Sequence, residues 1–220
     1  MLKQVILISA FFFIINATYN GIDISSWQGK INEFYKVRRA GYSFVILRAG
    51  YGHGTGDKNF ETNWKYAKDA RLNIGAYWTC KATSIEQSKY EALMFIIAMR
   101  YKQFEYPVYY DMEYKETFKL GKELTSKIAD NFCKILEEHK YYCGIYASKD
   151  DLENYFTSDV LKKYPIWVAQ YKPNCTYSGE YQMWQNSTEG KILGLKGKFN
   201  TDISYVDYPT IIKRKKMNGF

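Results

Sequence analysis

The chain has 220 residues, which is enough for one substantial hydrophobic core and too few for two full domains. Its composition is 46% hydrophobic and 18% aromatic, with 22 tyrosines, and this fits a soluble globular protein. The formal net charge is +8, and four of the basic residues lie in a C-terminal tail, residues 211–220, that contains no acidic residue. The tail either attracts an anionic polymer or membrane surface or is a solvated terminus, and without a recognised motif we expect no nucleic-acid partner.

The N-terminal segment, residues 1–17, has the pattern of a secretory signal peptide. A basic residue, Lys3, precedes an apolar run from Val5 to Ile15, and Ala17 offers a small residue for cleavage. The run of about 11 residues is shorter than the roughly 20 that a membrane-spanning helix needs. We therefore expect an exported protein without stable membrane insertion, which is secreted, extracellular or held in a phagosomal or secretory compartment.

Short apolar strands alternate with helical patterns along most of the remaining chain. The patterns predict strands over residues 19–25, 43–49, 74–78, 107–112 and 142–147, and helices over 31–40, 59–71, 84–101 and 122–139, with a short helical stretch after 147. The pattern changes after Pro165. From there, residues 166–171, 181–185, 191–195 and 202–206 read as strands or turns with no room for helices between them.

This order of elements indicates βαβ units around a parallel sheet. The loss of helices after Pro165 fits a barrel better than an open sheet, in which the alternation would continue. We therefore predict an α/β fold over residues 18–210, a modified TIM-type barrel of about five β/α units followed by strands lacking helices. No G-x-G-x-x-G motif follows a strand, so no dinucleotide site is expected. In barrels of this kind the active site lies at the C-terminal ends of the strands.

The four cysteines of the chain are even in number and lack the C-x-x-C spacing of a zinc site. In an exported protein they are therefore expected to form disulfides. Three pairings are possible. The positions at strand and helix ends favour Cys133 with Cys143 and Cys80 with Cys175.

The most informative site candidates are Asp111 and Glu113, which end the strand predicted over 107–112. Because alternate side chains of a strand share a face, the two carboxyl groups point to the same side, with Cα atoms roughly 6.5 Å apart. Like charges this close shift each other's pKa, so that one group stays protonated while its neighbour is ionised. Glycoside hydrolysis requires that division of labour. An isolated pair of this kind is more often two solvated loop residues, so other residues must decide.

Two further acids, Asp23 and Asp202, fall in the first and last predicted strands. Asp23 stands between isoleucines, where a charge is costly unless it is paired or used. If the barrel closes, these strands are neighbours, and all four acids ring one cavity. The alternative for each acid taken alone is a capped or salt-bridged structural residue.

A set of short motifs runs in order along nearly all of residues 19–206. The segments are Gly-Ile-Asp-Ile-Ser-Ser-Trp-Gln-Gly at 21–29, Phe-Val-Ile-Leu-Arg-Ala at 44–49, Asp-Lys-Asn-Phe at 57–60 with Asn63, Gly-Ala-Tyr at 75–77, Asp-Met-Glu at 111–113, Trp-Val-Ala-Gln-Tyr at 167–171, Trp-Gln at 184–185, and residues 194–202. The ordered set resembles glycoside hydrolase family 25, the Chalaropsis-type lysozymes.

The resemblance implies a modified barrel and muramidase activity, which is hydrolysis of the β-1,4 bond between N-acetylmuramic acid and N-acetylglucosamine in bacterial peptidoglycan. It implies that Glu113 is the general acid. Asp111 would either steady an attacking N-acetyl group of the substrate or stabilise an oxocarbenium-like charge. Asp23 and Asp202 would hold the hydrogen bonds of the site and raise the pKa of Glu113 by repulsion.

Aromatic side chains near the predicted strand ends are candidates for stacking on sugar rings, whose C–H faces are apolar. Packing inside the barrel is an equally good interpretation for each of them. Arg48 ends the second strand and either binds substrate or forms a structural ion pair. The substrate-binding candidates are Tyr77, Trp78, Trp27, Tyr110, Trp167, Trp184 and Arg48.

The sequence offers no sign of a cofactor. The two histidines, His53 and His139, are too few for a metal cluster, so we expect no metal, and we expect a monomer. Two other functions stay open. One is hydrolysis of chitin-type N-acetylglucosamine polymers, and the other is glycan binding without catalysis.

Overall fold

The computed structural model describes residues 17–220, so the predicted signal peptide lies outside the described residues except for its last position. Its central feature is a closed barrel of eight strands, with a two-residue strand, β3 (Thr55–Gly56), appended to one of them. The barrel strands are β1 (Tyr19–Ile24), β2 (Phe44–Tyr51), β4 (Asn73–Thr79), β5 (Val108–Asp111), β6 (Cys143–Ser148), β7 (Ile166–Ala169), β8 (Met183–Gly190) and β9 (Phe199–Ser204).

The barrel is mostly parallel and closes through its first strand. Strands β1, β2, β4, β5, β6, β7 and β8 follow one another in parallel pairs, except that β9 inserts antiparallel between β8 and β1. The closure pairs Ile22 with Val45 on one side and with Thr201 on the other. The predicted modified TIM-type barrel is therefore confirmed.

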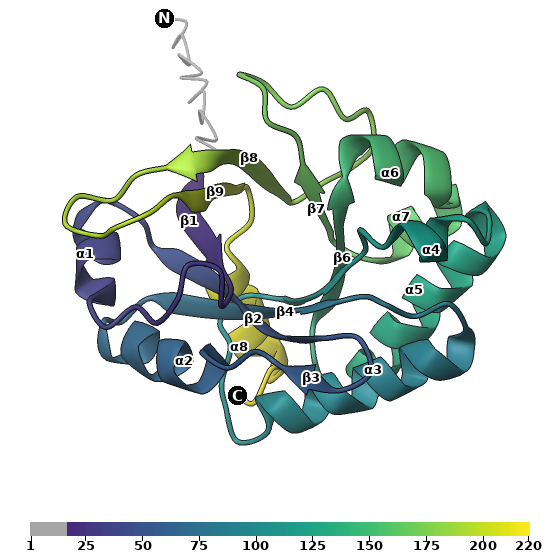
Figure 1. Cartoon of the computed structure of the whole chain (residues 1–220), viewed down its shortest axis with the longest axis horizontal. Coiled ribbons are helices and arrows are strands. Elements are labelled where there is room, and N and C mark those ends of the chain that lie inside the picture. Colours follow the sequence, from purple (N-terminus) through teal and green to yellow (C-terminus); the bar gives the residue numbers. More distant parts are fainter. Residues whose placement is uncertain (1–16) are drawn as a thin grey trace, which may run out of the picture.

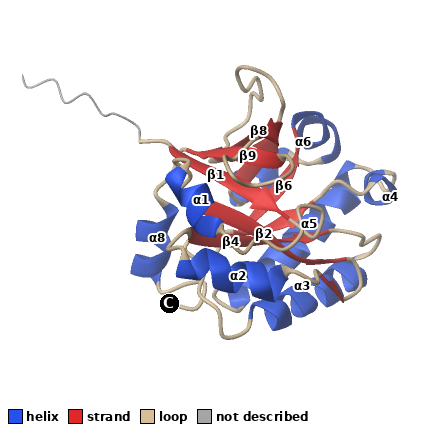
Figure 2. Ribbon diagram, turned by 60° about the vertical axis from the view of Figure 1, so that its left-hand side comes forward, coloured by secondary structure: helices blue, strands red, loops and turns tan. Residues whose placement is uncertain are grey.

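Helices cover the outside of the barrel, as the blue ribbons around the red strands in Figure 2 show. Ser84 and Ser148 begin two of them, because each serine oxygen accepts a hydrogen bond from a first-turn backbone N–H. None of the helices in residues 17–220 has the length and apolar character needed to cross a bilayer. The outer helices are α1 (Phe34–Arg39), α2 (Phe60–Asp69), α3 (Ile85–Met99), α4 (Lys115–Phe118), α5 (Lys122–Glu138), α6 (Lys149–Tyr155) and α7 (Ser158–Lys163).

The segments that join β7, β8 and β9 contain no helix, as predicted, and of the two alternatives for residues 191–195, strand or turn, the structure shows the turn. That segment is a turn, in which the backbone N–H of Leu195 donates to the carbonyl of Ile192 at 3.0 Å. Gly194 has a φ of +83°, which interrupts any extended strand. The final strand, β9, begins four residues beyond this segment.

Strand alternation sorts the core into two layers. Outward-facing side chains pack against the helices, and the ring of Tyr110 stacks on Phe132 of α5 with centroids 3.7 Å apart. Inward-facing side chains, mostly aromatic, fill the barrel itself. Glycines provide the space for them: a Cβ at Gly21 would lie 2.2 Å from the ring of Phe44. The interior at one end of the barrel is therefore packed rather than open.

The C-terminal residues, set apart by charge as a basic tail, are folded onto the barrel. Residues Tyr208–Lys215 form helix α8, drawn in yellow in Figure 1. Tyr208 and Ile212 are buried with the inward-facing residues Phe44 and Tyr106, so α8 closes the end of the barrel where the parallel strands begin. Asp207 caps the helix, and its basic residues lie in the last turn, where they interact favourably with the helix dipole.

The predicted disulfides are absent among the described residues, in which all four cysteines are free. The sulfurs of Cys133 and Cys143 are in contact at 3.1 Å, longer than the ~2.05 Å of a disulfide. Cys80 is buried beside Thr117, 3.8 Å away, whereas Cys175 lies in the segment after β7. The sequence placed both near strand ends but could not show that they face different neighbours.

The packing of α8 predicts that Ile212→Ala destabilises the whole protein by about 3 kcal/mol, because it leaves a cavity in the barrel end. Chemical denaturation measures the change. Arg214→Ala, at an exposed position on the same helix, is the control and should change the free energy of unfolding by less than about 0.5 kcal/mol. Equal, small effects of the two changes would mean that α8 is not part of the core.

Candidate active site

A small cavity opens at the end of the barrel where the parallel strands finish. Its volume is about 80 Å³, and side chains from seven of the eight barrel strands, or from just after them, converge on it. The only barrel strand without a lining residue is β2. The lining residues are Asp23, Tyr77, Asp111, Glu113, Tyr146, Trp167, Gln185 and Asn200.

Asp111 and Glu113 both line this cavity, as their spacing on a strand predicts. Asp111 is the last residue of β5 and is buried, and its Oδ2 accepts a hydrogen bond from the hydroxyl of Thr79 at 2.7 Å. Its other oxygen, Oδ1, has no hydrogen-bond partner among residues 17–220. Glu113 is exposed to solvent and also lines two neighbouring hollows. The two acids therefore differ in access: one is enclosed, and the other meets incoming molecules.

Asp23 reaches the cavity from β1 and is held by two amides. The side-chain N–H groups of Gln185 on β8 and Asn200 on β9 donate to its two carboxylate oxygens, the second at 3.0 Å. These amides lie more than 160 positions away in the chain, so Asp23 is positioned only when the barrel closes. Its flanking isoleucines, Ile22 and Ile24, face the outer layer, as alternation requires.

Asp202 differs from the prediction, because it does not line the cavity. It is buried on β9, paired with Gly21, and its Oδ1 accepts a hydrogen bond from the indole N–H of Trp167 at 2.9 Å. Three of the four predicted acids therefore face the cavity, and the fourth supports its aromatic wall. This difference follows from the register of β1 against β9, in which Asn200 rather than Asp202 is paired with Asp23.

Desolvation raises the pKa of all four acids, including Glu113, which lines the cavity although the residue as a whole is exposed. Desolvation is the largest cause for each, and it raises the pKa of Asp23 to about 7 despite the two amide hydrogen bonds. The pKa values of Asp111 and Asp202 are also raised, by burial first and then by repulsion from Glu113 and Asp23 respectively. The pKa of Glu113 is raised by desolvation and then by the charge of Asp151. The site therefore favours protonated carboxyl groups at mildly acidic pH.

Gln185 is a candidate site residue that the sequence interpretation missed. Besides donating to Asp23, its Oε1 accepts hydrogen bonds from the hydroxyls of Tyr146 at 2.9 Å and Tyr171 at 2.7 Å. One amide therefore ties β1, β6, β8 and the segment after β7 together at the cavity. Strand alternation could have identified it, because Gln185 lies two positions after Met183 on the same strand and therefore faces inward as Met183 does.

The alternation of side chains along each strand also divides the predicted aromatic residues into inward-facing and outward-facing ones. Tyr77 and Trp167 line the cavity, and their rings meet edge to face with centroids 6.2 Å apart. Trp78, Tyr110 and Trp184 are wrong as substrate contacts, because they point outward into the layer beneath the helices. There they are buried and bonded: the Trp78 indole donates to Gly52, the Tyr110 hydroxyl to Glu91, and the Trp184 indole to Gln170.

Trp27 and Arg48 lie at the rim rather than in the cavity. Trp27 follows β1 and is 87% exposed, an unusual state for so large an apolar side chain. Arg48 forms an ion pair with buried Asp57 at 2.9 Å and donates to the hydroxyl of Ser26 at 2.8 Å. Asp57 also accepts from the backbone N–H of Ser26, so the ion pair holds the loop that carries Trp27. For Arg48 the structure favours the ion-pair alternative.

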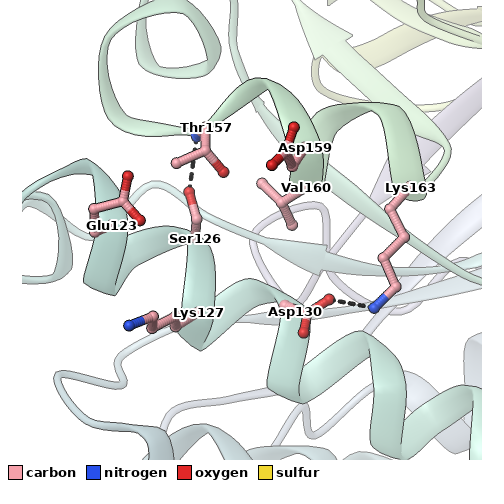
Figure 3. A pocket seen from close by; sticks show the side chains of 8 residues that line it. All are labelled: Glu123, Ser126, Lys127, Asp130, Thr157, Asp159, Val160 and Lys163. Carbon is pink, nitrogen blue, oxygen red and sulfur yellow. Dashed lines mark hydrogen bonds and ion pairs between the residues drawn. The ribbon is translucent and has the colours of Figure 1, made fainter.

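A larger groove of about 240 Å³ lies between α5 and α7, away from the acids. Figure 3 shows two interactions among its lining residues: Lys163 is paired with Asp130, and the hydroxyl of Ser126 accepts from the backbone of Thr157. Within residues 17–220, no group of three or more metal-binding side chains is arranged to hold a metal ion. The small cavity is therefore the stronger candidate for chemistry.

Comparisons with known proteins agree with this geometry. The family described as "Glycosyl hydrolases family 25" matches residues 22–195. The chain is 27% identical over 198 residues to the uncharacterized protein YegX of Escherichia coli strain K12, covering 84% of this chain and 69% of the relative. It is 27% identical over 188 residues to the autolytic lysozyme of Clostridium acetobutylicum, covering 83% of this chain and 54% of that protein. A solved family 25 glycosyl hydrolase from Bacillus anthracis has the same fold, with a TM-score of 0.74, 22% identity and coverage of 89% and 92%.

The raised carboxyl pKa values predict a pH-dependent stability. A group whose folded-state pKa exceeds its unfolded value stabilises the protein fully at low pH, and the stabilisation is lost as the pH rises through the folded-state pKa. For Asp23, with a shift from 3.8 to about 7, this amounts to up to about 4 kcal/mol from about pH 4 to about pH 8.

Thermal unfolding across this range checks the prediction. The melting temperature of the unaltered protein should fall with rising pH, and Asp23→Asn should flatten the slope. Asp69→Asn, at an exposed position on α2, should leave the slope unchanged. An identical slope in Asp23→Asn and the unaltered protein would contradict the assignment of a proton to Asp23.

Proposed function

The chain belongs to family 25 of the glycosyl hydrolases, and on that premise we propose that it is a lysozyme that hydrolyses the β-1,4 bond between N-acetylmuramic acid and N-acetylglucosamine in bacterial peptidoglycan. The observation that carries the proposal is the single cavity shared by Asp111 and Glu113. The similarity to the autolytic lysozyme of Clostridium acetobutylicum supports the choice of substrate.

Glu113 is the general acid in this proposal. It is open to solvent, so a glycosidic oxygen can approach it, and its raised pKa favours the protonated form that donates to the leaving group. The enclosed acids are less suited to this role. Asp111 and Asp23 are buried: both oxygens of Asp23 accept hydrogen bonds from Gln185 and Asn200, and Oδ2 of Asp111 accepts one from Thr79.

Asp111 acts on the other side of the reaction. Its Oδ1 is buried without a partner among residues 17–220, and a buried acceptor in that state gains from a donor that the substrate brings. An N-acetyl N–H is such a donor, so Asp111 either steadies that group for attack on the anomeric carbon or faces the positive charge of the transition state. In either role the hydrogen bond from the hydroxyl of Thr79 orients the carboxyl group of Asp111.

The remaining lining residues hold the sugar and the acids. Tyr77 and Trp167 offer ring faces and edges to the apolar side of a sugar, and Trp27 offers a platform at the rim. Gln185 keeps Asp23 oriented, and Asp202 keeps Trp167 in place. Asp23 and Asp202 are positioning residues in this account.

Chitin hydrolysis and glycan binding without turnover are the alternatives. The first requires a cavity that accepts polymers of N-acetylglucosamine alone, and the second requires that the acids have no catalytic use. Digestion of purified peptidoglycan beside chitin oligomers, with mass spectrometry of the products, separates all three. We also propose that the protein is exported through its N-terminal segment, because peptidoglycan is an extracellular polymer.

Glu113→Gln should reduce kcat on peptidoglycan by about 10³-fold, because the amide keeps the shape of the side chain but cannot supply the proton. Release of reducing sugar measures the rate. Binding of the substrate should change little. Glu86→Gln, at an exposed position in the first turn of α3, is the matched control and should retain the full rate. Full activity of Glu113→Gln would exclude Glu113 as the acid.

A further inference from the structure

Glu113 lines two further hollows besides the small cavity. The first, here called the α4 hollow, has a volume of about 340 Å³ and is lined by Glu113, Lys115, Lys119, Asp151 and the rings of Phe118 and Tyr155. The second, the β7 hollow, has about 280 Å³ and includes Glu113, Lys149, Asp150 and Lys172 in its lining. Because both hollows share Glu113, a polymer that presents a bond to this residue has room on either side.

Each hollow contains two lysines, and in each one lysine is already paired. Lys119 forms an ion pair with Glu116 at 2.6 Å in the α4 hollow. Lys149 forms one with Glu153 at 2.8 Å in the β7 hollow. The acid of the α4 hollow, Asp151, accepts a hydrogen bond from Ser148 at 2.6 Å.

The second lysine of each hollow is free to bind a ligand. Neither Lys115 nor Lys172 forms an ion pair within residues 17–220, and both side chains are exposed. They lie in different hollows that share Glu113 and come from different loops, one after β5 and the other after β7. An ammonium group on a flexible stem is suited to a carboxylate whose position varies. Two free ammonium groups, in separate hollows that share Glu113, indicate a ligand with an anionic group on each side of the reacting bond.

The proposed substrate has this distribution of charge. Its two sugars alternate, and every muramic acid carries a short peptide with carboxylate groups, so a strand lying across Glu113 brings an acidic peptide to each side. Resting on the proposed function, we infer that Lys115 and Lys172 bind the carboxylates of these peptides. The stacked rings of Phe118 and Tyr155, with centroids 4.5 Å apart, give the α4 hollow an apolar wall for the rest of a peptide. The enzyme therefore selects glycan strands by the charge of their peptides as well as by their sugars.

The test compares two soluble substrates that differ only in charge: peptidoglycan fragments, and the same fragments with their peptide carboxylates converted to methylamides. The unaltered enzyme should show a kcat/KM about fivefold higher on the charged substrate, since exposed ion pairs each contribute a small factor. The preference should shrink as the salt concentration rises from about 0.02 M to about 0.5 M.

A double variant, Lys115→Gln with Lys172→Gln, should bring the ratio of the two kcat/KM values close to one. The matched control is Lys89→Gln with Lys134→Gln, which removes the same charge from exposed positions on α3 and α5 and should keep the fivefold ratio. A ratio unchanged in the first double variant, or a ratio of one in the unaltered enzyme, would overturn the inference while leaving the proposed function intact. Hydrolysis of neither substrate would overturn both.

Discussion

The structure depends on the pairing of β1 with two partners at once. Strand β1 runs parallel to β2, which follows it directly, and antiparallel to β9, which lies almost 180 residues further along the chain. This double pairing closes the barrel, and together with the pairing of β8 and β9 it brings Asp23 next to the amides of Gln185 and Asn200. The contacts that position Asp23 in the cavity therefore form only when the chain from β1 to β9 has folded.

Closure has an energetic consequence, because it removes carboxyl groups from water. Asp23, Asp111 and Asp202 are all buried, and burial disfavours their charged forms. The barrel compensates with uncharged hydrogen-bond donors: Gln185 and Asn200 donate to Asp23, Thr79 to Asp111, and Trp167 to Asp202. These donors orient each carboxyl group. Unlike a lysine or an arginine, they do not neutralise its charge. The one nearby arginine, Arg48, is instead paired with Asp57 at the rim.

The two ends of the barrel differ in the side chains that face inward. At the end where the strands begin, large inward-facing rings and helix α8 leave little space. At the end where they finish, the inward-facing positions carry acids, amides and tyrosines instead. Glu113, two residues beyond the buried Asp111, is more exposed to solvent than the other residues that line the cavity. Stability and reactivity are therefore served by opposite ends of the same strands.

Much of this could be predicted from the sequence, because strand patterns, the change after Pro165 and the spacing of Asp111 and Glu113 are local signals. The outward direction of Trp78 and Tyr110 was available from the same alternation, since Tyr77 and Asp111 beside them face inward. Other features depend on distant pairing. Gln185 acquires its position beside Asp23 only from the register of β8 against β9 and of β9 against β1. That α8 covers the barrel end could not be read from the local sequence, because the four basic residues of the C-terminal segment suggested a solvated tail.

The most direct test of the account is a crystal structure of the Glu113→Gln protein with an uncleaved oligosaccharide of alternating N-acetylmuramic acid and N-acetylglucosamine. The account predicts that the bond to be cleaved lies over the small cavity, with its oxygen about 2.6–3.2 Å from the side chain of residue 113 and an N-acetyl group facing Asp111. A saccharide bound elsewhere, for example in the groove between α5 and α7, with the cavity unoccupied, would contradict it.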